Sequence, residues 1–191
     1  MNRFIRIAGA AAFAAAAFAH AQAAPLSADG SWHTFDVDTA LSGGNGWIDI
    51  TDGTPLNFTF AVGSGNVGVL TVVDTVFAGD TFKVYNNGSL LGTTSSVPPG
   101  FYDPSATGIV DPVLALADPL FSRGSFVLGP GSYSISGVLD QSVLDVPGGT
   151  PLNATSGGIS LTVSAPVPEP ETYAMLLAGL GLLCLVGRRC A

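Results

Sequence analysis

Cysteine, glutamate and histidine are nearly missing from the interior of this chain. Between residues 24 and 166 there is no cysteine and no glutamate, and His33 is the one histidine. The lack of cysteine excludes a disulfide framework, and too few ligands remain for a zinc site. A serine–histidine–aspartate triad would depend on His33, which lies in a strand-like alternating stretch, and no G-x-S-x-G elbow is present. We therefore expect a domain without catalytic activity and without a bound cofactor.

Positive charge is equally scarce in this interior segment. It holds one lysine, Lys83, and one arginine, Arg123, against twelve aspartates, which gives a net charge of −10. The whole chain has a pI near 4.2. A nucleic-acid-binding protein needs a basic surface, so nucleic acid is excluded as a partner. An acidic polysaccharide would also be repelled unless cations bridged the two surfaces.

The positive residues that do occur lie mostly at the two ends. At the N-terminus, Arg3 and Arg6 precede an apolar stretch over residues 7–19. The following AHAQAA segment places small residues where signal peptidase needs them, with cleavage after Ala21 or Ala23. An amphipathic surface helix is excluded because residues 7–19 have no polar face. This pattern predicts a secretory signal peptide over residues 1–23.

The C-terminus carries a second apolar stretch. Residues 172–187 are uncharged and mostly apolar, and as a helix they would span about 24 Å, slightly less than the hydrocarbon core of about 30 Å. Arg188 and Arg189 follow directly and would stay in the cytoplasm by the positive-inside rule. A buried core helix would show a polar stripe, and this stretch has none. We expect a transmembrane helix over 172–187, with the region between the two ends outside the cytoplasm.

A short proline motif precedes this predicted helix. Val167, Pro168, Glu169 and Pro170 place two prolines one residue apart, so the segment neither continues a helix nor joins a sheet. It would hold the chain extended just outside the membrane, where an enzyme can read it. The motif, the apolar span and the basic stop at 188–189 together resemble the PEP-CTERM sorting signal of Gram-negative bacteria. The same tail has been called an ice-binding protein C-terminal domain, a label that implies nothing about ice.

The resemblance implies a route for the protein. In this family an exosortase-type membrane transpeptidase recognises the tail of an inner-membrane-anchored precursor. The processed protein then reaches the cell-envelope surface or the extracellular matrix, where such proteins accompany exopolysaccharide and biofilm. The resemblance covers residues 167–191, and it departs from the family's pattern where Cys190 and Ala191 replace a longer basic run. Extracellular polysaccharide is therefore an expected partner.

Residues 24–166 have the sequence pattern of an all-β domain. Stretches rich in valine, isoleucine, threonine and aromatic residues alternate with clusters of glycine, asparagine, aspartate and proline. Asn87-Gly88 predicts a hairpin turn, and the proline-rich stretch 95–120 predicts a long surface excursion. No segment shows helix caps around a 3.6-residue period. We expect an antiparallel β-sandwich of eight to ten strands, with a jelly roll as one form of it.

Two kinds of binding module remain as alternatives on the same export route. Asp36 and Asp38 lie on one face of the first predicted strand, while Asp49 and Asp52 stand beside glycines, so these four are candidate calcium ligands. The competing interpretation is that such aspartates form turns and supply solubility. A lectin-like face is the other alternative, and its competing interpretation is that the aromatic residues form the core. The candidates for that face are Trp32, Trp47, Tyr85, Tyr102 and Tyr133.

Overall fold

A computed structural model of the chain describes residues 21–165 and 175–180. The segment 21–165 forms nine strands and two short helices. The predicted signal-peptide core, the sorting motif from Val167 to Pro170 and the basic stop at Arg188 and Arg189 lie outside the described residues. The elements are β1 (Gln22–Pro25), β2 (Asp29–Asp38), α1 (Thr39–Ser42), β3 (Leu56–Val62), β4 (Val67–Thr75), β5 (Thr81–Asn86), β6 (Ser89–Thr93), α2 (Pro112–Ala117), β7 (Arg123–Leu128), β8 (Gly131–Gln141) and β9 (Ala154–Ser164).

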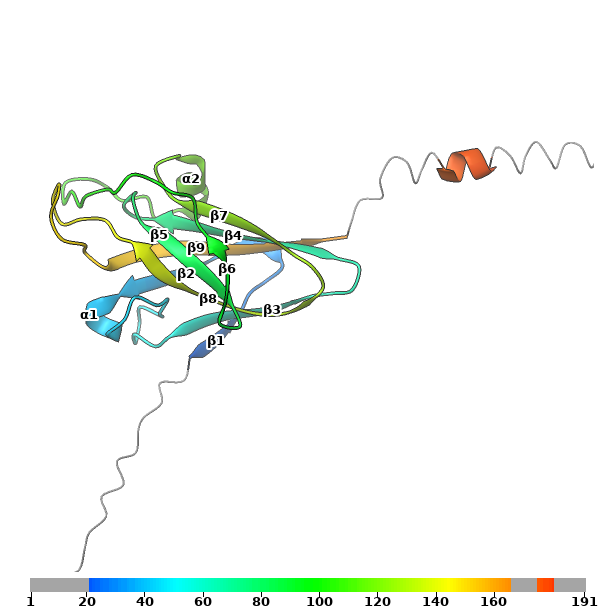
Figure 1. Cartoon of the computed structure of the whole chain (residues 1–191), viewed down its shortest axis with the longest axis horizontal. Coiled ribbons are helices and arrows are strands. Elements are labelled where there is room, and N and C mark those ends of the chain that lie inside the picture. Colours follow the sequence, from blue (N-terminus) through cyan, green and yellow to red (C-terminus); the bar gives the residue numbers. More distant parts are fainter. Residues whose placement is uncertain (1–20, 166–174, 181–191) are drawn as a thin grey trace, which may run out of the picture.

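The strands form two sheets that face each other (Figure 1). One sheet has the order β1-β3-β8-β5-β6 and the other has the order β2-β9-β4-β7. The predicted β-sandwich is thereby confirmed. Consecutive strands from β2 to β9 lie in different sheets, except for the β5–β6 hairpin, and this is the order that jelly rolls use. One pairing departs from the antiparallel expectation, because β1 is added to the edge of β3 in parallel.

The connections at the two ends of the sandwich differ in length. Short turns at 63–66, 87–88 and 129–130 close one end. The Asn87-Gly88 turn is confirmed there, since both residues have positive φ, 48° and 79°. The long connections 39–55, 76–80, 94–122 and 142–153 all gather at the opposite end, which we call the loop end (on the left in Figure 1). The predicted excursion over 95–120 is one of them.

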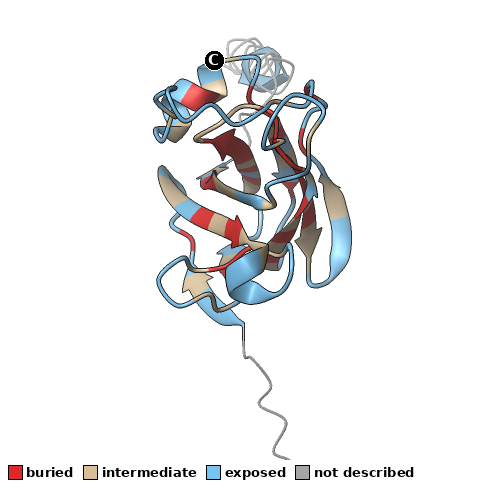
Figure 2. Ribbon diagram, turned by 90° about the vertical axis from the view of Figure 1, so that its left-hand side faces the viewer, coloured by how far each residue is buried: buried red, intermediate tan, exposed pale blue. Residues whose placement is uncertain are grey.

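An aromatic cluster fills the space between the sheets. Phe35 of β2 stacks on Trp47 with ring centroids 3.9 Å apart, and Phe82 of β5 meets Phe35 edge-on at 5.1 Å. Trp47 comes from the long connection after α1, and its amide donates to the carbonyl of Gly137 at 2.9 Å. A Cβ at Gly137 would lie 2.2 Å from the indole, so only glycine fits beneath it. Figure 2 looks onto the loop end and shows, in red, the buried segments of the strands that form the two layers.

Two short helices with aspartate caps lie in the connections, and α2 covers residues 113–117, which the sequence leaves open between a short strand and one helical turn. Asp38 accepts the amides of Ala40 and Leu41 at 2.8 and 3.1 Å and starts α1. Asp111 accepts the amide of Val113 at 2.8 Å and starts α2, with proline in the first turn. Both are too short for a 3.6-residue period to be visible in the sequence. Aspartate before the first turn satisfies amides that the helix leaves free.

Beyond the sandwich, residues 175–180 form a helical stretch with exposed side chains. Within residues 21–165 and 175–180, no helix is long and apolar enough to cross a membrane. The predicted transmembrane helix over 172–187 extends beyond the described residues on both sides, so it stays a prediction.

Candidate functional site

A groove of about 390 Å³ opens at the loop end, where β2 ends and β9 begins. Its walls come from five separate parts of the chain: the end of β2, the connection between α1 and β3, the corner between β4 and β5, the excursion after β6, and the start of β9 with the residues just before it. We call it the loop-end groove. Its volume falls in the range of about 300–1,000 Å³ that small-molecule sites occupy. The residues that line it are Asp36, Val37, Asp38, Ile50, Val76, Phe77, Tyr102, Leu152, Ala154, Thr155 and Ser156.

Two carboxylates form the polar wall of the groove. Asp36 is half-buried, and its backbone exchanges two hydrogen bonds with Ile48, at 3.1 and 2.8 Å, which fixes its position. The hydroxyl of Ser156, opposite it on β9, donates to Oδ1 of Asp36. Asp38 lies two residues further along the same face and uses its Oδ1 to cap α1. Burial, and then the negative charge of Asp49, raises the pKa of Asp36, while the Ser156 hydroxyl opposes that rise.

Two aromatic rings also line the groove. Phe77 and Tyr102 meet edge-on, with centroids 5.1 Å apart and planes at 84°. Tyr102 belongs to the excursion after β6, and its amide donates to the carbonyl of Leu144 at 2.7 Å. This bond ties the excursion to the connection between β8 and β9. Tyr102 remains 40% exposed, so a ligand in the groove can contact its ring.

The corner between β4 and β5 brings Phe77 to the groove through an unusual backbone. Val76 has φ of 70°, a conformation that is costly for a β-branched residue. Two hydrogen bonds with the backbone of Ile109, at 2.7 and 3.0 Å, hold it there. Gly79 and Gly100 approach so closely that a Cβ on Gly79 would lie 2.3 Å from the Gly100 nitrogen. The corner is therefore fixed against two segments of the excursion.

Two buried aspartates flank this corner. Asp74 ends the inward-facing row of β4, and Asp80 precedes the inward-facing Phe82 of β5; Asp74 is 0% exposed and Asp80 is 1% exposed. Oδ2 of Asp74 accepts the amide of Asp80 at 3.2 Å, whereas its Oδ1 has no partner among the described residues. Asp80 accepts the amide of Val143 at 2.7 Å.

Burial dominates the proton affinities of this pair. It raises the pKa of Asp74 to about 9, with the negative charge of Asp80 as the second cause. It also raises the pKa of Asp80 to about 6. Two carboxylates this close and this deeply buried do not both ionise readily at neutral pH. Asp74 therefore carries a proton, and the pair joins β4, β5 and the 142–153 connection behind the groove.

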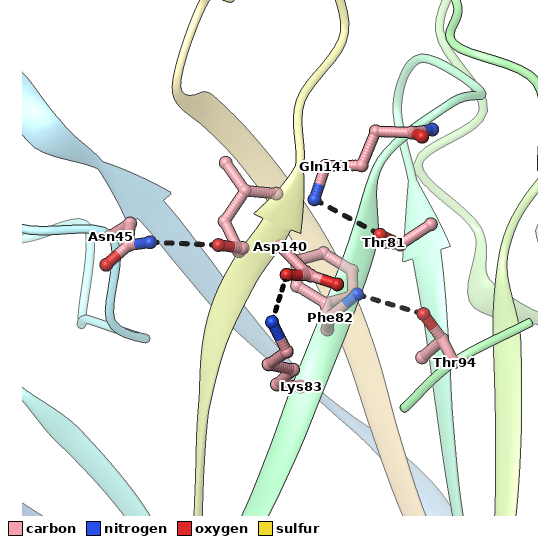
Figure 3. Close-up of polar contacts among 8 residues, drawn as sticks. Asn45, Thr81, Phe82, Lys83, Thr94, Asp140 and Gln141 are labelled. Atoms are coloured by element: carbon pink, nitrogen blue, oxygen red, sulfur yellow. Dashed lines mark hydrogen bonds and ion pairs between the residues drawn. The ribbon is translucent and has the colours of Figure 1, made fainter. Parts of the chain in front are cut away.

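A larger cleft of about 630 Å³ lies nearby, between β5, β6 and the end of β8. Several of its polar groups already have partners within the protein (Figure 3). Thr81 accepts the amide of Gln141, Thr94 accepts the amide of Phe82, and Lys83 forms an ion pair with Asp140. The Gln141 side chain donates to two carbonyls at 2.7 and 3.1 Å. Since these groups already have partners, the cleft offers a ligand less than the loop-end groove does.

The candidate calcium ligands are only partly brought together. Asp36 and Asp38 share the groove, and Asp49 is close enough to influence the charge of Asp36. Asp49 accepts the amide of Thr51, and Asp52 accepts the amide and hydroxyl of Thr54, as turn-forming aspartates do. Within the described parts of the chain, no three acidic, histidine or cysteine side chains gather in a way that could hold a metal ion.

The predicted aromatic face does not form as one surface. Trp47 lies in the main core, and Trp32 packs beside α2 in a smaller core. Tyr133 stacks on Phe60 with centroids 5.1 Å apart, and Tyr85 is a partly buried residue of β5. Tyr102 alone of the five lines the loop-end groove.

Sequence reasoning missed the partners of Tyr102 and the buried aspartate pair. Asp74 is in phase with the inward-facing Leu70 and Val72, and Asp80 is in phase with Phe82. A period of two, extended by one step at each strand end, would have placed both carboxyls inside. No comparable signal exists for Phe77, which reaches the groove from the corner between β4 and β5, or for Ser156, which the pairing of β9 with β2 brings beside Asp36.

Comparison with known proteins concerns mainly the other end of the molecule. Residues 166–189 match the family described as the PEP-CTERM protein-sorting motif. The chain carries a PEP-CTERM tail. The matched residues include Val167, Pro168, Glu169 and Pro170 as well as Arg188 and Arg189. Such a tail marks an exported protein that is anchored in the membrane before an exosortase processes it.

The β-sandwich that precedes the PEP-CTERM tail has no comparable match. No curated protein matches the chain. Among solved structures, the chain is similar to the pre-peptidase C-terminal domain of a collagenase from Bacillus anthracis, with 11% identity and a TM-score of 0.37. That similarity covers 75% of this chain and 95% of the other. So faint a likeness says nothing about what the sandwich binds.

Proposed function

We propose that this PEP-CTERM protein is a non-enzymatic component of the cell surface or extracellular matrix, associated with exopolysaccharide. The single observation that carries the proposal is the tail matched at residues 166–189. It follows a β-sandwich with buried Phe35, Trp47 and Phe82 at its centre, which has a core of its own and needs no cytoplasmic partner to bury it. The signal-peptide pattern at the N-terminus supports the same direction of export.

The absence of an enzyme site is part of this proposal. His33 lies within β2 and faces Phe58 edge-on at 6.3 Å between ring centroids. Within the described residues its ring forms no hydrogen bond to a serine hydroxyl or an aspartate, which a catalytic triad requires. Hydrolysis that depended on His33 would contradict this part, and assays of His33→Ala on polysaccharide and peptide substrates measure it.

The route itself is tested in cells. We expect surface labelling and fractionation to place the protein outside the cytoplasm in cells that contain the exosortase. In cells without the exosortase, the protein should stay with the inner membrane. Recovery of the protein from the cytosol with both ends attached would contradict the proposal.

A carbohydrate-binding module on the same route is the second candidate, and one observation favours it. The loop-end groove combines the exposed ring of Tyr102 with the carboxylate of Asp36, which is the mixture of apolar surface and few polar groups that sugar sites use. Calcium binding at Asp36, Asp38, Asp49 and Asp52 remains a prediction, and a calcium-dependent shift of the melting temperature measures it.

A further inference from the structure

We propose that the loop-end groove binds a saccharide that carries a protonated amino group, with the ring face against Tyr102 and the amine beside Asp36 and Asp38. The inference deepens the proposed function, because it names the class of polysaccharide that the exported protein would meet. The inference rests on the proposed function only for the location, outside the cell, where the protein would meet this ligand. The class of ligand is argued from the residues of the groove.

The aromatic wall suits a sugar ring. Sugars present a face of C–H groups, which packs on aromatic rings, and Tyr102 combines an apolar ring with a polar hydroxyl at the groove. Phe77 supports it edge-on, with 5.1 Å between centroids, so the ring is held in place before a ligand arrives. The bond from the Tyr102 amide to Leu144 fixes the backbone as well. A site that is already ordered loses less entropy on binding.

The polar wall suits a cation. Within the described residues, the hydrogen bonds of Asp36 and Asp38 use Oδ1 of each carboxylate, which leaves Oδ2 of both for a ligand. Ser156 keeps the Asp36 carboxylate in one orientation. A protonated amine between two carboxylates forms charge-assisted hydrogen bonds, which are the stronger kind. A bound cation offsets the cost of holding a negative charge on the half-buried Asp36, and it offsets the repulsion between Asp36 and the nearby charge of Asp49.

The charge balance excludes an acidic ligand. Among the residues that the structure describes, no lysine, arginine or histidine lines the groove. The two basic side chains of the segment 24–166 are engaged elsewhere: Lys83 pairs with Asp140, and Arg123 donates to the carbonyls of Leu116 and Asp118 near α2. With a net charge of −10 on this segment, the surrounding field attracts cations and repels anions. Charge complementarity therefore selects an amine-bearing sugar over a uronic acid.

The position of the groove suits an extracellular ligand. It lies where β9 begins, at Ala154, whereas the chain leaves the sandwich toward its tail at Ser164, the other end of β9 (Figure 1). An eleven-residue strand is about 30 Å long. The groove is thus separated from the point where the chain turns toward the membrane, and a polymer can reach it while the precursor is still anchored.

The test compares two oligosaccharides that differ in charge. The exported protein, as recovered from its producing cells, is titrated by calorimetry with a glucosamine hexamer and with the N-acetylated hexamer. We expect the glucosamine hexamer to bind at least about tenfold more tightly, which corresponds to one charge-assisted contact. Equal binding of the two oligomers, or no binding of either, would overturn the proposal.

Matched variants separate the groove from the acidic surface as a whole. Tyr102→Ala and Asp36→Asn should each weaken the glucosamine hexamer at least about tenfold. Phe101→Ala, an exposed aromatic neighbour outside the groove, and Asp29→Asn, the same charge change on an exposed residue at the other end of β2, should bind as the unmodified protein does. Equal losses of affinity in the variants and the controls would show that the hexamer is attracted only to the acidic surface as a whole, and would overturn the proposal that it binds in the groove.

A measurement without substitutions decides the matter if a variant does not fold. In the unmodified protein, chemical-shift changes on adding the glucosamine hexamer should gather at residues 36–38, 76–77, 102 and 154–156. Changes spread over the acidic surface, with none at these residues, would overturn the proposal. The cellular location and the C-terminus of the protein are measured separately. A negative result for binding in the groove therefore does not affect the test of export, and it is distinguishable from failure of the proposed function.

Discussion

Replacing Asp74 by asparagine gives the sharpest test of the buried carboxyl pair. Asp74 is fully buried, accepts the Asp80 amide through Oδ2 and has an unpartnered Oδ1. Burial raises the pKa of Asp74 to about 9, so its carboxyl is protonated in the folded protein at neutral pH. Asparagine has the size and the neutral charge of a protonated aspartate. We expect Asp74→Asn to match the wild type below about pH 4, where Asp74 is protonated in both the folded and the unfolded state, and to be the more stable protein at higher pH, where the unfolded wild type is ionised.

The magnitude follows from proton linkage. The folded pKa values of Asp74 and Asp80, about 9 and about 6, both exceed the ordinary value of 3.8, so the folded state holds more protons in between. The stability they contribute is complete below about pH 4 and is lost as the pH rises toward each folded value. Each extra proton gives a slope of about −1.4 kcal/mol per pH unit. Between about pH 6 and pH 8, Asp74 therefore lowers the wild-type free energy of unfolding by roughly 3 kcal/mol.

Urea unfolding followed by tryptophan fluorescence measures this, because Trp47 is buried in the core. With EDTA present, the wild type should lose stability from about pH 6 to pH 8, whereas Asp74→Asn should stay level. The variant should exceed the wild type by roughly 3 kcal/mol at about pH 6 and by roughly 6 kcal/mol at about pH 8, because the loss in the wild type begins at the ordinary pKa of 3.8. The control Asp52→Asn changes an exposed carboxyl whose pKa is lowered by the Thr54 amide, and it should keep the wild-type slope. A level wild-type profile, or a less stable Asp74→Asn at about pH 8, would refute the reasoning.

Two further predictions concern the core and the N-terminal edge strand. Gly137→Ala places a methyl group 2.2 Å from the Trp47 ring and should lower the free energy of unfolding by about 1–3 kcal/mol. The control Gly44→Ala, which has nothing within 4 Å of its added methyl group, should change the free energy of unfolding by less than about 0.5 kcal/mol. Equal urea midpoints for the two variants would contradict the close packing of Trp47 on Gly137. A chain that starts at Ala24 instead of Gln22 loses half of β1 and the bond from the Gln22 amide to Pro55, and should be less stable by about 1 kcal/mol. An unchanged urea midpoint would show that these two residues add nothing to the sheet.

The strands could be predicted because their patterns are local. Alternation of apolar residues in β4 and β9, and the Asn87-Gly88 turn, depend on neighbours within a few positions. The edge strand Gln22–Pro25 could not be predicted, because its sequence has no strand preference and it pairs only through the exposed edge of β3. Sheet order depends on contacts between residues such as Asp36 and Ser156, which are 120 positions apart.

The site was predictable in its residue types but not in its assembly. Asp36, Asp38 and Tyr102 were all candidates from the sequence, yet they belonged to two different hypotheses, calcium binding and a lectin-like face. The structure places them in one groove because the excursion after β6 folds back against the β4–β5 corner, where Gly79 meets Gly100. Such a backbone approach leaves no periodic pattern in the sequence. The PEP-CTERM tail, in contrast, is a contiguous motif and could be recognised from the sequence without knowledge of the fold.

The central claim is that the tail delivers the sandwich to the outside and is then processed. Mass spectrometry of the C-terminus tests it most directly, on protein recovered from the surface or medium of cells that contain the exosortase. We predict that the released protein ends between Pro168 and Glu171. In cells without the exosortase, the protein should retain the residues that follow Glu171. An intact chain through Ala191 in the released protein would contradict the claim.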